Sequence, residues 1–224
     1  GGRYALRAVI GQGGFAVVYR AQQLSIDREV AVKVLKLDGA LDRTLGHRFE
    51  GEAKIISQLR HPNTLKLIDF GETEDGHVYL VTELLTGNPL DQILEAGPLP
   101  PRLVISILKQ IAGALEEAHE LGIIHRDLKP ANIFIEQVSR RHVAKVLDFG
   151  IAKVHSAQSQ TMSGQMFGTP LYMSPEQVKE GVLDGRSDLY SLGVVAYHCL
   201  TGETPFAGSS GYSILMKHTT EQPP

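Results

Sequence analysis

The hydrophobic pattern of this chain changes type near residue 84, and that change limits its possible folds more than any other feature. Before it, short runs rich in β-branched and aromatic residues alternate with Gly or Asp turns, which is typical of strands. We expect strands over 4–10, 16–21, 30–35, 65–70 and 77–83. One helix is expected over 44–59, ending before His61 and Pro62.

Beyond a short connector, the apolar residues recur at helical spacing. Asn88 is expected to cap a short helix that opens with Pro89 and runs to about 96. A longer helix is predicted over 101–121, with Gly122 as its C-terminal cap. The segment 187–200 is apolar almost all round, which predicts a helix buried in the middle of a lobe. A last short helix is expected over 212–218.

These patterns predict an α+β domain over 1–224 with two lobes. The β-rich lobe with its one helix would cover 1–83, the hinge 84–87 and the helical lobe 88–224. Hydrophobic residues make up 42% and charged residues 21% of the chain, and the net charge is −3, so no nucleic-acid or membrane contact is expected. The single cysteine, Cys199, indicates a reducing compartment such as the cytoplasm.

A glycine-rich segment, GQGGFAVV, occupies 11–18. Glycine lets backbone N–H groups approach phosphate oxygens closely. Because strand-forming residues follow it, the segment is predicted to be a hairpin and not the turn of a dinucleotide-binding fold, which leads into a helix. No Gly-Lys pair is present, which excludes a phosphate-binding P-loop. On this feature alone, the alternative that the segment is a glycine hairpin that binds no ligand is still possible.

Lys33 and Glu52 form a predicted ion pair. Lys33 lies in the strand over 30–35, where a solvated lysine is the ordinary alternative. Glu52 shares the apolar face of the helix over 44–59 with Phe49 and Ile56. A buried carboxylate without a cation would cost several kcal/mol, so Lys33 is its expected partner.

The segment HRDLKPAN at 125–132 carries the strongest signal. It lies between a predicted helix and the apolar strand at 133–135, so rigid elements would hold it. Asp148 follows the next predicted strand, in the triplet Asp-Phe-Gly. Asn132 and Asp148 offer oxygen ligands suited to Mg²⁺, and Asp127 would then accept or orient the proton of an attacking hydroxyl.

Taken together, these motifs resemble the Hanks-type protein kinases, and especially the bacterial serine/threonine kinases, over almost the whole chain. The resemblance implies the two-lobed kinase fold and transfer of the γ-phosphoryl group of ATP to Ser or Thr hydroxyls of proteins. The metal would be Mg²⁺, with Mn²⁺ as the alternative.

The resemblance also implies roles for individual residues. Lys33, paired with Glu52, would hold the α and β phosphates, and Lys129 would reach the γ-phosphoryl group. Asp127 would be the catalytic aspartate, with Thr169 bridging it to Lys129, while Asn132 and Asp148 would bind the metal. The other implied nucleotide contacts are Ile10, Gly11, Gln12, Gly13, Gly14, Phe15, Ala16, Val18, Ala31, Thr82, Glu83, Leu85 and Phe134. A stack of Ile56, Leu67, His125 and Phe149, anchored by Asp188, would mark the active state.

In related kinases the hydroxyl-rich segment 150–174 is the activation loop. We expect autophosphorylation at Thr161 or Ser163, with self-association for transfer between copies, and Arg126 as a phosphate partner. Any membrane anchor of a longer protein would lie outside this segment.

Several features depart from the pattern. Ala16 replaces the third glycine of the hairpin, and the chain stops before the last helices of the family. We therefore expect a truncated helical lobe with exposed apolar surface, and an unpaired Glu176. His119-Glu120 lacks a second histidine four residues after the first, so a zinc-binding helix is excluded.

Two other functions stay open. A pseudokinase would keep the fold without catalysis, although Lys33, Glu52, Asp127, Asn132 and Asp148 are all present. A small-molecule kinase, such as an antibiotic phosphotransferase, would share the loop aspartate and the metal aspartate but lack the Gly168 to Glu176 substrate shelf.

Overall fold

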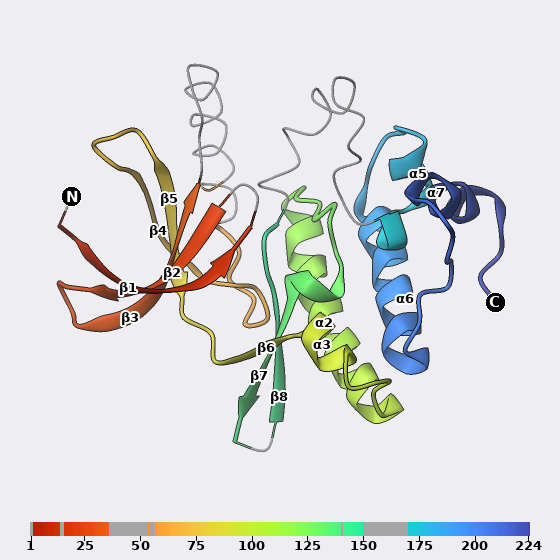
Figure 1. Cartoon of the computed structure of the whole chain (residues 1–224), viewed down its shortest axis with the longest axis horizontal. Helices are drawn as coiled ribbons and strands as arrows, with labels where there is room; N and C mark the ends of the chain where they lie inside the picture. The colour runs from red at the N-terminus through yellow and green to blue at the C-terminus, as the bar shows by residue number, and fades with distance from the viewer. Residues whose placement is uncertain (1, 14–15, 36–52, 54–56, 140, 150–169) are drawn as a thin grey trace. The chain divides into compact units, whose positions relative to one another are not determined.

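The structure is a computed structural model that describes residues 2–13, 16–35, 53, 57–139, 141–149 and 170–224 (Figure 1). These residues form two compact units, each described below by itself. Unit 1 comprises Gly1–Arg60 and Leu65–Thr86, and unit 2 comprises His61–Thr64 and Gly87–Pro224. Most of the helix expected over 44–59 lies outside the described residues. Ala53 is helical and buried, and its carbonyl accepts the Ser57 N–H at 2.9 Å.

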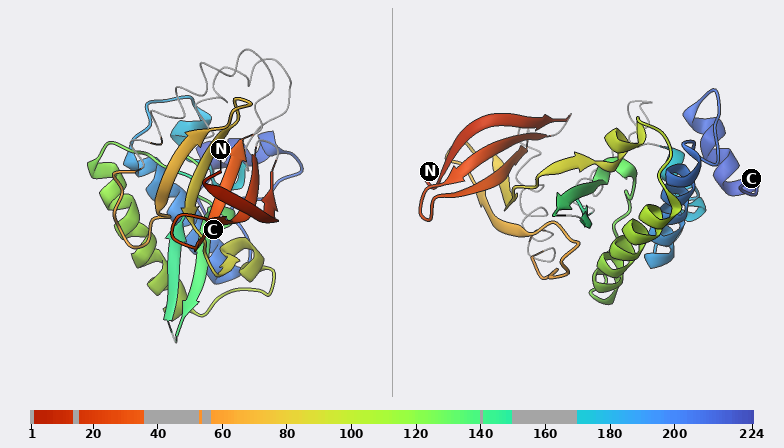
Figure 2. Two further views of the ribbon diagram at one scale, coloured as in Figure 1. Left: turned by 90° about the vertical axis from the view of Figure 1, so that its left-hand side faces the viewer. Right: turned by 90° about the horizontal axis from the view of Figure 1, so that it is seen from below.

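Unit 1 is built on one antiparallel sheet with the strand order β1-β2-β3-β5-β4 (Figure 2). The strands are β1 (Tyr4–Gln12), β2 (Ala16–Gln23), β3 (Arg28–Leu35), β4 (Leu67–Glu72) and β5 (Val78–Glu83). All five predicted strands are confirmed, with ends shifted by one or two residues in most cases. Neighbouring strands follow one another in the chain except that β5 inserts between β3 and β4, which a hairpin between β4 and β5 allows.

The two faces of this sheet differ because side chains alternate along each strand. One face carries the hydrophobic core of the unit. Val30 and Val32 of β3 belong to this face, and their neighbours in β3, Ala31 and Lys33, therefore project from the other. The core consists of Ala21, Val30, Val32 and Val81, with Tyr4, Val34, Ile68 and Tyr79 packed against it.

Unit 2 combines a small antiparallel sheet, ordered β6-β7-β8, with helices. Its elements are β6 (Gly87–Pro89), α2 (Leu90–Leu94), α3 (Pro101–Glu120), η1 (Pro130–Asn132), β7 (Ile133–Val138), β8 (Arg141–Val146), η3 (Pro170–Tyr172), α5 (Pro175–Val178), α6 (Gly185–Thr201) and α7 (Gly211–Thr220). Helix α3 packs against β8 on one side and α6 on the other (Figure 1). Among the described residues, no helix has the length and apolar character that a membrane crossing requires.

Helix α3 confirms the long helix predicted from periodicity. Its buried residues are Val104, Ile107, Ile111, Ala114, Leu115 and Ala118. Gly122 adopts a left-handed φ of 73°, as a C-terminal glycine cap does. The Gly122 and Ile123 N–H groups donate to His119 and Ala118, which ends the helix where the sequence indicated.

Two predictions about the helices of unit 2 were wrong. Asn88 does not cap α2, because it pairs with Ile135 as part of β6, and Pro89 is the capping residue. Helix α6 is not buried all round in the described structure: Leu189 and Leu200 are about half exposed. Its buried face carries Ser187, Asp188 and Ser191, which are polar, beside Val194, Val195 and Cys199.

Candidate active site

The segment between α3 and β7 forms a loop that is anchored by buried side chains. Leu128 is 1% exposed and Pro130 is buried, and this packing fixes the backbone that carries the polar residues next to them. The single-turn helix η1 then leads directly into β7. This local structure follows from the sequence, because proline fits the first position of a helical turn.

Three residues of this loop lie together. The Lys129 Nζ is 3.0 Å from the Asp127 Oδ2, and both side chains are about one quarter exposed. The Asn132 Nδ2 donates to the Asp127 backbone oxygen at 2.8 Å and to its Oδ2 at 3.2 Å. Asp127 is thus oriented by an amide and an ammonium group while it remains within reach of solvent.

Asp148 is brought to the same region by the backbone. The Leu147 N–H donates to the Asn132 carbonyl at 2.9 Å, so the residue that follows Leu147 lies next to η1. Asp148 has a φ of 48°, a left-handed conformation that is uncommon for a residue other than glycine and that clusters at functional sites. Phe149 is buried, and its ring centroid lies 4.9 Å from that of His125.

This arrangement fits a magnesium ion. The side-chain amide nitrogen of Asn132 donates to Asp127. The Asn132 side-chain oxygen, Oδ1, is therefore the atom that could bind a cation, together with the Asp148 carboxylate. Within the described ranges no group of three His, Cys, Asp or Glu side chains gathers as a metal site. Mg²⁺ does not need one, because it commonly takes one or two protein oxygens and completes its shell with water and phosphate.

Asp188 of α6 supports the loop from below. Its carboxylate is 1% exposed and accepts hydrogen bonds from the His125 N–H at 2.8 Å and the Arg126 N–H at 2.9 Å. The His119 Nε2 lies 2.8 Å from the Asp188 Oδ2. These bonds to the backbone of His125 and Arg126 are consistent with the expected anchoring of the loop by Asp188. His119 is a further partner of Asp188, to which the sequence had assigned no role.

His125 is fully buried at the centre of this arrangement. Burial lowers the pKa of its imidazole, and the carboxylates of Asp188, Asp127 and Asp148 act in the opposite direction. The His125 Nε2 lies 2.8 Å from the Leu147 carbonyl oxygen, which links the loop to the strand that carries Asp148.

In unit 1, strand register places four predicted nucleotide contacts on one face of the sheet. Val18 is opposite Lys33, and Ala31 is opposite Thr82. Residues directly opposite each other project to the same side, and residues two apart along a strand also share a side. Val18, Ala31, Lys33 and Thr82 therefore lie together on the face opposite the hydrophobic core.

The predicted glycine-rich hairpin joins β1 to β2. Its strands pair Gly11 with Val18, and the Gly13 N–H donates to the Ala16 carbonyl at 2.9 Å. A Cβ added at Gly11 would make only ordinary contacts, 3.7 Å from Val18, and a Cβ at Gly13 would lie 4.0 Å from the Ala16 backbone oxygen, also an ordinary contact. Packing within the described structure thus does not demand glycine at either position.

The connector after β5 is irregular over 84–86, whereas Gly87, the last residue of the expected hinge, already belongs to β6. The Thr82 Oγ1 donates to the Glu83 carbonyl at 3.2 Å, and the Glu83 N–H donates to the Lys66 carbonyl at 3.1 Å. Leu85 and, in unit 2, Phe134 of β7 are partly buried, and Ile10 and Gln12 of β1 lie in or near the hairpin.

Several predicted residues lie outside the described part of the chain. These are Gly14, Phe15, Glu52, Ile56, Thr161, Ser163 and Thr169. The proposed pairing of Lys33 with Glu52 and the bridging role of Thr169 therefore stay predictions.

The prediction that Glu176 is unpaired was wrong. Its Oε1 accepts a hydrogen bond from the Ser187 Oγ at 2.5 Å. Burial alone would raise the pKa of Glu176. Hydrogen bonds from Ser187, from the Glu176 backbone and from Ser174 instead hold this pKa below its ordinary value. The serine on the buried face of α6 could not be matched to this glutamate from sequence spacing.

Sequence reasoning also missed Asn63 and Gln177. The Asn63 Nδ2 donates to the Ala144 carbonyl at 2.7 Å, and the Asn63 backbone carbonyl accepts the Val146 N–H at 2.7 Å. These two bonds fix β8 ahead of Asp148. Gln177 contacts the loop at Arg126. A Ser-x-x-Gln pattern at 174–177 signals a helix start, but nothing in it indicates that contact.

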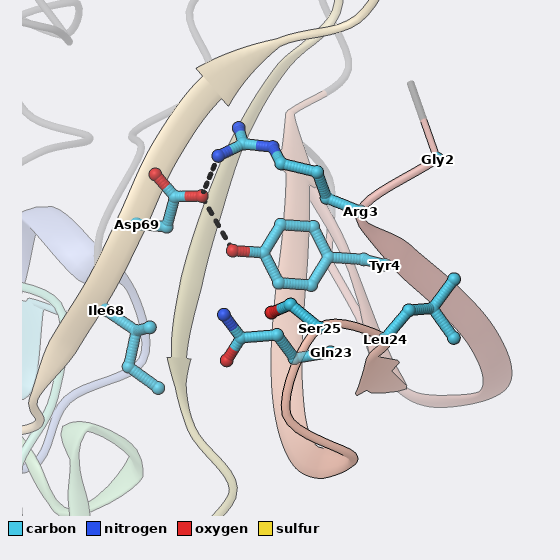
Figure 3. Close-up of a pocket in the computed structure, with 8 residues that line it drawn as sticks. All are labelled: Gly2, Arg3, Tyr4, Gln23, Leu24, Ser25, Ile68 and Asp69. Atoms are coloured by element: carbon cyan, nitrogen blue, oxygen red, sulfur yellow. Dashed lines mark hydrogen bonds and ion pairs between the residues drawn. The ribbon is translucent and has the colours of Figure 1, made fainter.

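A hollow in unit 1 lies away from these residues (Figure 3). The Asp69 Oδ2 accepts from the Tyr4 hydroxyl at 2.6 Å and is 2.8 Å from the Arg3 Nη1. Burial, followed by the Asp69 bond, raises the pKa of Tyr4 to about 12. The hollow is lined by Gly2, Arg3, Tyr4, Gln23, Leu24, Ser25, Ile68 and Asp69, none of which is a predicted nucleotide contact.

Comparison with known proteins agrees with the site chemistry. The family described as "Protein kinase domain" matches residues 4–223. The chain is 44% identical to serine/threonine-protein kinase pkn3 of Myxococcus xanthus, over 99% of this chain and 42% of that protein. It is 42% identical to serine/threonine-protein kinase PrkC of Bacillus subtilis, over 100% of this chain and 34% of that protein. It thus spans less than half the length of these relatives.

Proposed function

Since this chain belongs to the protein kinase domain family and is similar to bacterial Hanks-type serine/threonine kinases, we propose that it transfers the γ-phosphoryl group of ATP to Ser or Thr hydroxyls of proteins. The observation that carries the proposal is the placement of Asp127 between the Lys129 ammonium and the Asn132 amide. A carboxylate held in this way, yet about one quarter exposed, suits an incoming hydroxyl.

In the proposed reaction the hydroxyl oxygen forms a bond to the γ-phosphorus, and the bond between that phosphorus and the bridging oxygen of ADP breaks. The hydroxyl proton passes to the Asp127 carboxylate. Lys129 lies close enough to Asp127 to offset negative charge on the transferred group. Asn132 and Asp148 would hold the Mg²⁺ or Mn²⁺ ion, which when bound neutralises phosphate charge.

In unit 1, Lys33 would bind the α and β phosphates, and Val18, Ala31 and Thr82 would line the position of the adenine. Their common face of the sheet supports this role. The Glu83 and Leu85 backbones would contact the adenine edge. Protein substrates, autophosphorylation at Thr161 or Ser163, and self-association are further parts of the proposal, as is a cytoplasmic location for this segment.

The test is transfer of labelled phosphate from ATP to a generic basic protein and, in parallel, to small alcohols such as aminoglycosides. Transfer to the protein alone is expected, with Ser and Thr as acceptors by mass mapping. Asp127→Asn should lower kcat by roughly 10²- to 10⁴-fold, because it removes the proton acceptor but keeps the shape.

Transfer only to the small alcohols would assign the chain to the other class of kinase. An Asp148→Ala variant with full turnover would contradict the enzymatic mechanism. If the wild-type chain bound ATP but transferred nothing, the pseudokinase alternative would stand.

A further inference from the structure

The peptide group between Arg126 and Asp127 is held from both sides. Its carbonyl oxygen, on Arg126, accepts a hydrogen bond from the Gln177 Nε2 at 2.7 Å. Its N–H, on Asp127, donates to the His125 Nδ1 at 3.3 Å. Because a peptide group is planar, fixing both of its ends fixes the direction of the Asp127 N–Cα bond. The Asn132 Nδ2, which donates to the Asp127 backbone oxygen at 2.8 Å, restricts rotation about that bond, so the two holds together orient the Asp127 side chain.

This peptide needs such support. Arg126 has a φ of 63°, in the left-handed region that costs an arginine roughly 1–2 kcal/mol. The Asp188 carboxylate holds the N–H of Arg126 at 2.9 Å, on the other side of its Cα. Strained backbone persists only where its surroundings determine it, and here Gln177 supplies the hold on the carbonyl.

Gln177 is itself fixed by the cap of α5. Its Oε1 accepts the Ser174 N–H at 3.0 Å, and its own N–H donates to the Ser174 Oγ at 3.3 Å. Ser174 is fully buried. Both ends of the Gln177 amide are therefore used, the oxygen within the cap and the nitrogen on the loop.

We propose that Gln177 is a positioning residue that orients Asp127 through the Arg126 carbonyl. This rests on the proposed function, in which Asp127 accepts the substrate proton. Gln177 need not touch substrate or nucleotide for this role. Its amide nitrogen is the group that matters, since a glutamate at this position of a capping box would serve the cap equally well.

Gln177→Glu separates the two roles. Glutamate keeps the acceptor for the Ser174 N–H but replaces the donor with a carboxylate oxygen facing the Arg126 carbonyl. We expect kcat to fall about tenfold or more, as a lost hydrogen bond to a fixed group does, with the KM for ATP within about twofold of wild type. The unfolding temperature should stay close to that of wild type. Gln177→Met, which loses both bonds, should lower kcat and the unfolding temperature together.

Gln137→Glu is the matched control, because it adds the same charge at an exposed position of β7 and should change neither value. Hydrogen exchange gives a readout that does not require catalysis. The N–H groups of 125–127 should exchange several-fold faster in Gln177→Glu than in Gln137→Glu.

The inference is overturned if Gln177→Glu keeps kcat within twofold of Gln137→Glu and the exchange of 125–127 is unchanged. It is also overturned if Gln177→Glu loses as much thermal stability as Gln177→Met, since Gln177 would then be a structural cap. A wild-type chain without phosphoryl transfer would instead refute the proposed function, and the exchange experiment would still decide whether Gln177 holds the loop.

Discussion

Asp188 is the residue on which the loop geometry depends most directly. A carboxylate that is 1% exposed must have hydrogen-bond donors, and it accepts from two backbone N–H groups of the loop. His119 lies against the same carboxylate, and the ring needs room there. A Cβ at Gly185 would come within 2.5 Å of the His119 Nδ1, so the glycine that begins α6 leaves space for this imidazole.

His119→Leu should therefore destabilise unit 2 by about 1–3 kcal/mol, because Asp188 loses a hydrogen-bond partner in a buried place. His119→Gln should recover most of the loss, since its amide nitrogen can take the place of Nε2. Urea unfolding measures both. His142→Leu, at an exposed position of β8, serves as the control. Equal stability of the leucine and glutamine variants would show that the hydrogen bond contributes nothing.

Strand β6 is the element in which a tertiary contact overrides a local sequence signal. Asn88-Pro89 is a good start for a helix, yet Gly87, Asn88 and Pro89 pair with β7. Gly87 makes the close approach possible: its φ is 156°, and a Cβ there would lie 2.1 Å from the Ile135 carbonyl oxygen. Only a residue without a side chain fits next to that backbone atom.

Gly87→Ala should accordingly lower the free energy of unfolding by about 1–3 kcal/mol, because the backbone of β7 has to move away. Gly193→Ala is the same substitution, but it should have the opposite effect on stability. Gly193 is exposed within α6 and has open space around it, so alanine should raise the stability by up to about 1 kcal/mol. Thermal unfolding of the two variants side by side would check the pair, and a neutral Gly87→Ala would contradict the close approach.

At the scale of the whole molecule, unit 2 contains the fully buried His125 and His218 and the partly buried His198. Burial lowers the pKa of His125, His198 and His218. The His198 Nδ1 lies 2.8 Å from the Tyr172 hydroxyl, and the His218 Nδ1 lies 2.8 Å from the Tyr190 hydroxyl. These hydroxyls can donate to a neutral imidazole but not to a protonated one.

The stability of the chain should consequently fall as the pH drops below about 6.5. The unfolded chain binds protons at these histidines with ordinary pKa values, whereas the folded chain binds them only at lower pH, so acidification favours unfolding. The urea midpoint should be lower at pH 5.5 than at pH 7.5. His198→Gln should flatten this dependence and His142→Gln should not. The lowered pKa of Glu176 acts only at more acidic pH, below about 4.5. An unchanged midpoint would mean that the folded chain binds protons at these histidines as readily as the unfolded chain does, which would contradict the lowered pKa values.

The sequence by itself predicted most of the helices and strands and proposed the site residues, because both depend on local sequence patterns. Short runs of β-branched and aromatic residues between Gly or Asp turns identified the strands of unit 1, and helical spacing with a terminal glycine identified α3. The loop at 125–132 could be recognised because several polar residues follow one another in a fixed order. Its family could be recognised from the same order.

The tertiary structure alone decided which distant groups hold those residues in place. Ser187 pairs with Glu176, His119 with Asp188, and Gln177 with the Arg126 carbonyl. Each of these contacts joins separate elements, and the partner is set by how α3, α5 and α6 pack around the loop. A hydrogen bond from a side chain to a distant side chain or backbone carbonyl carries almost no sequence signal, since many groups of the chain are possible partners and only folding brings one within reach.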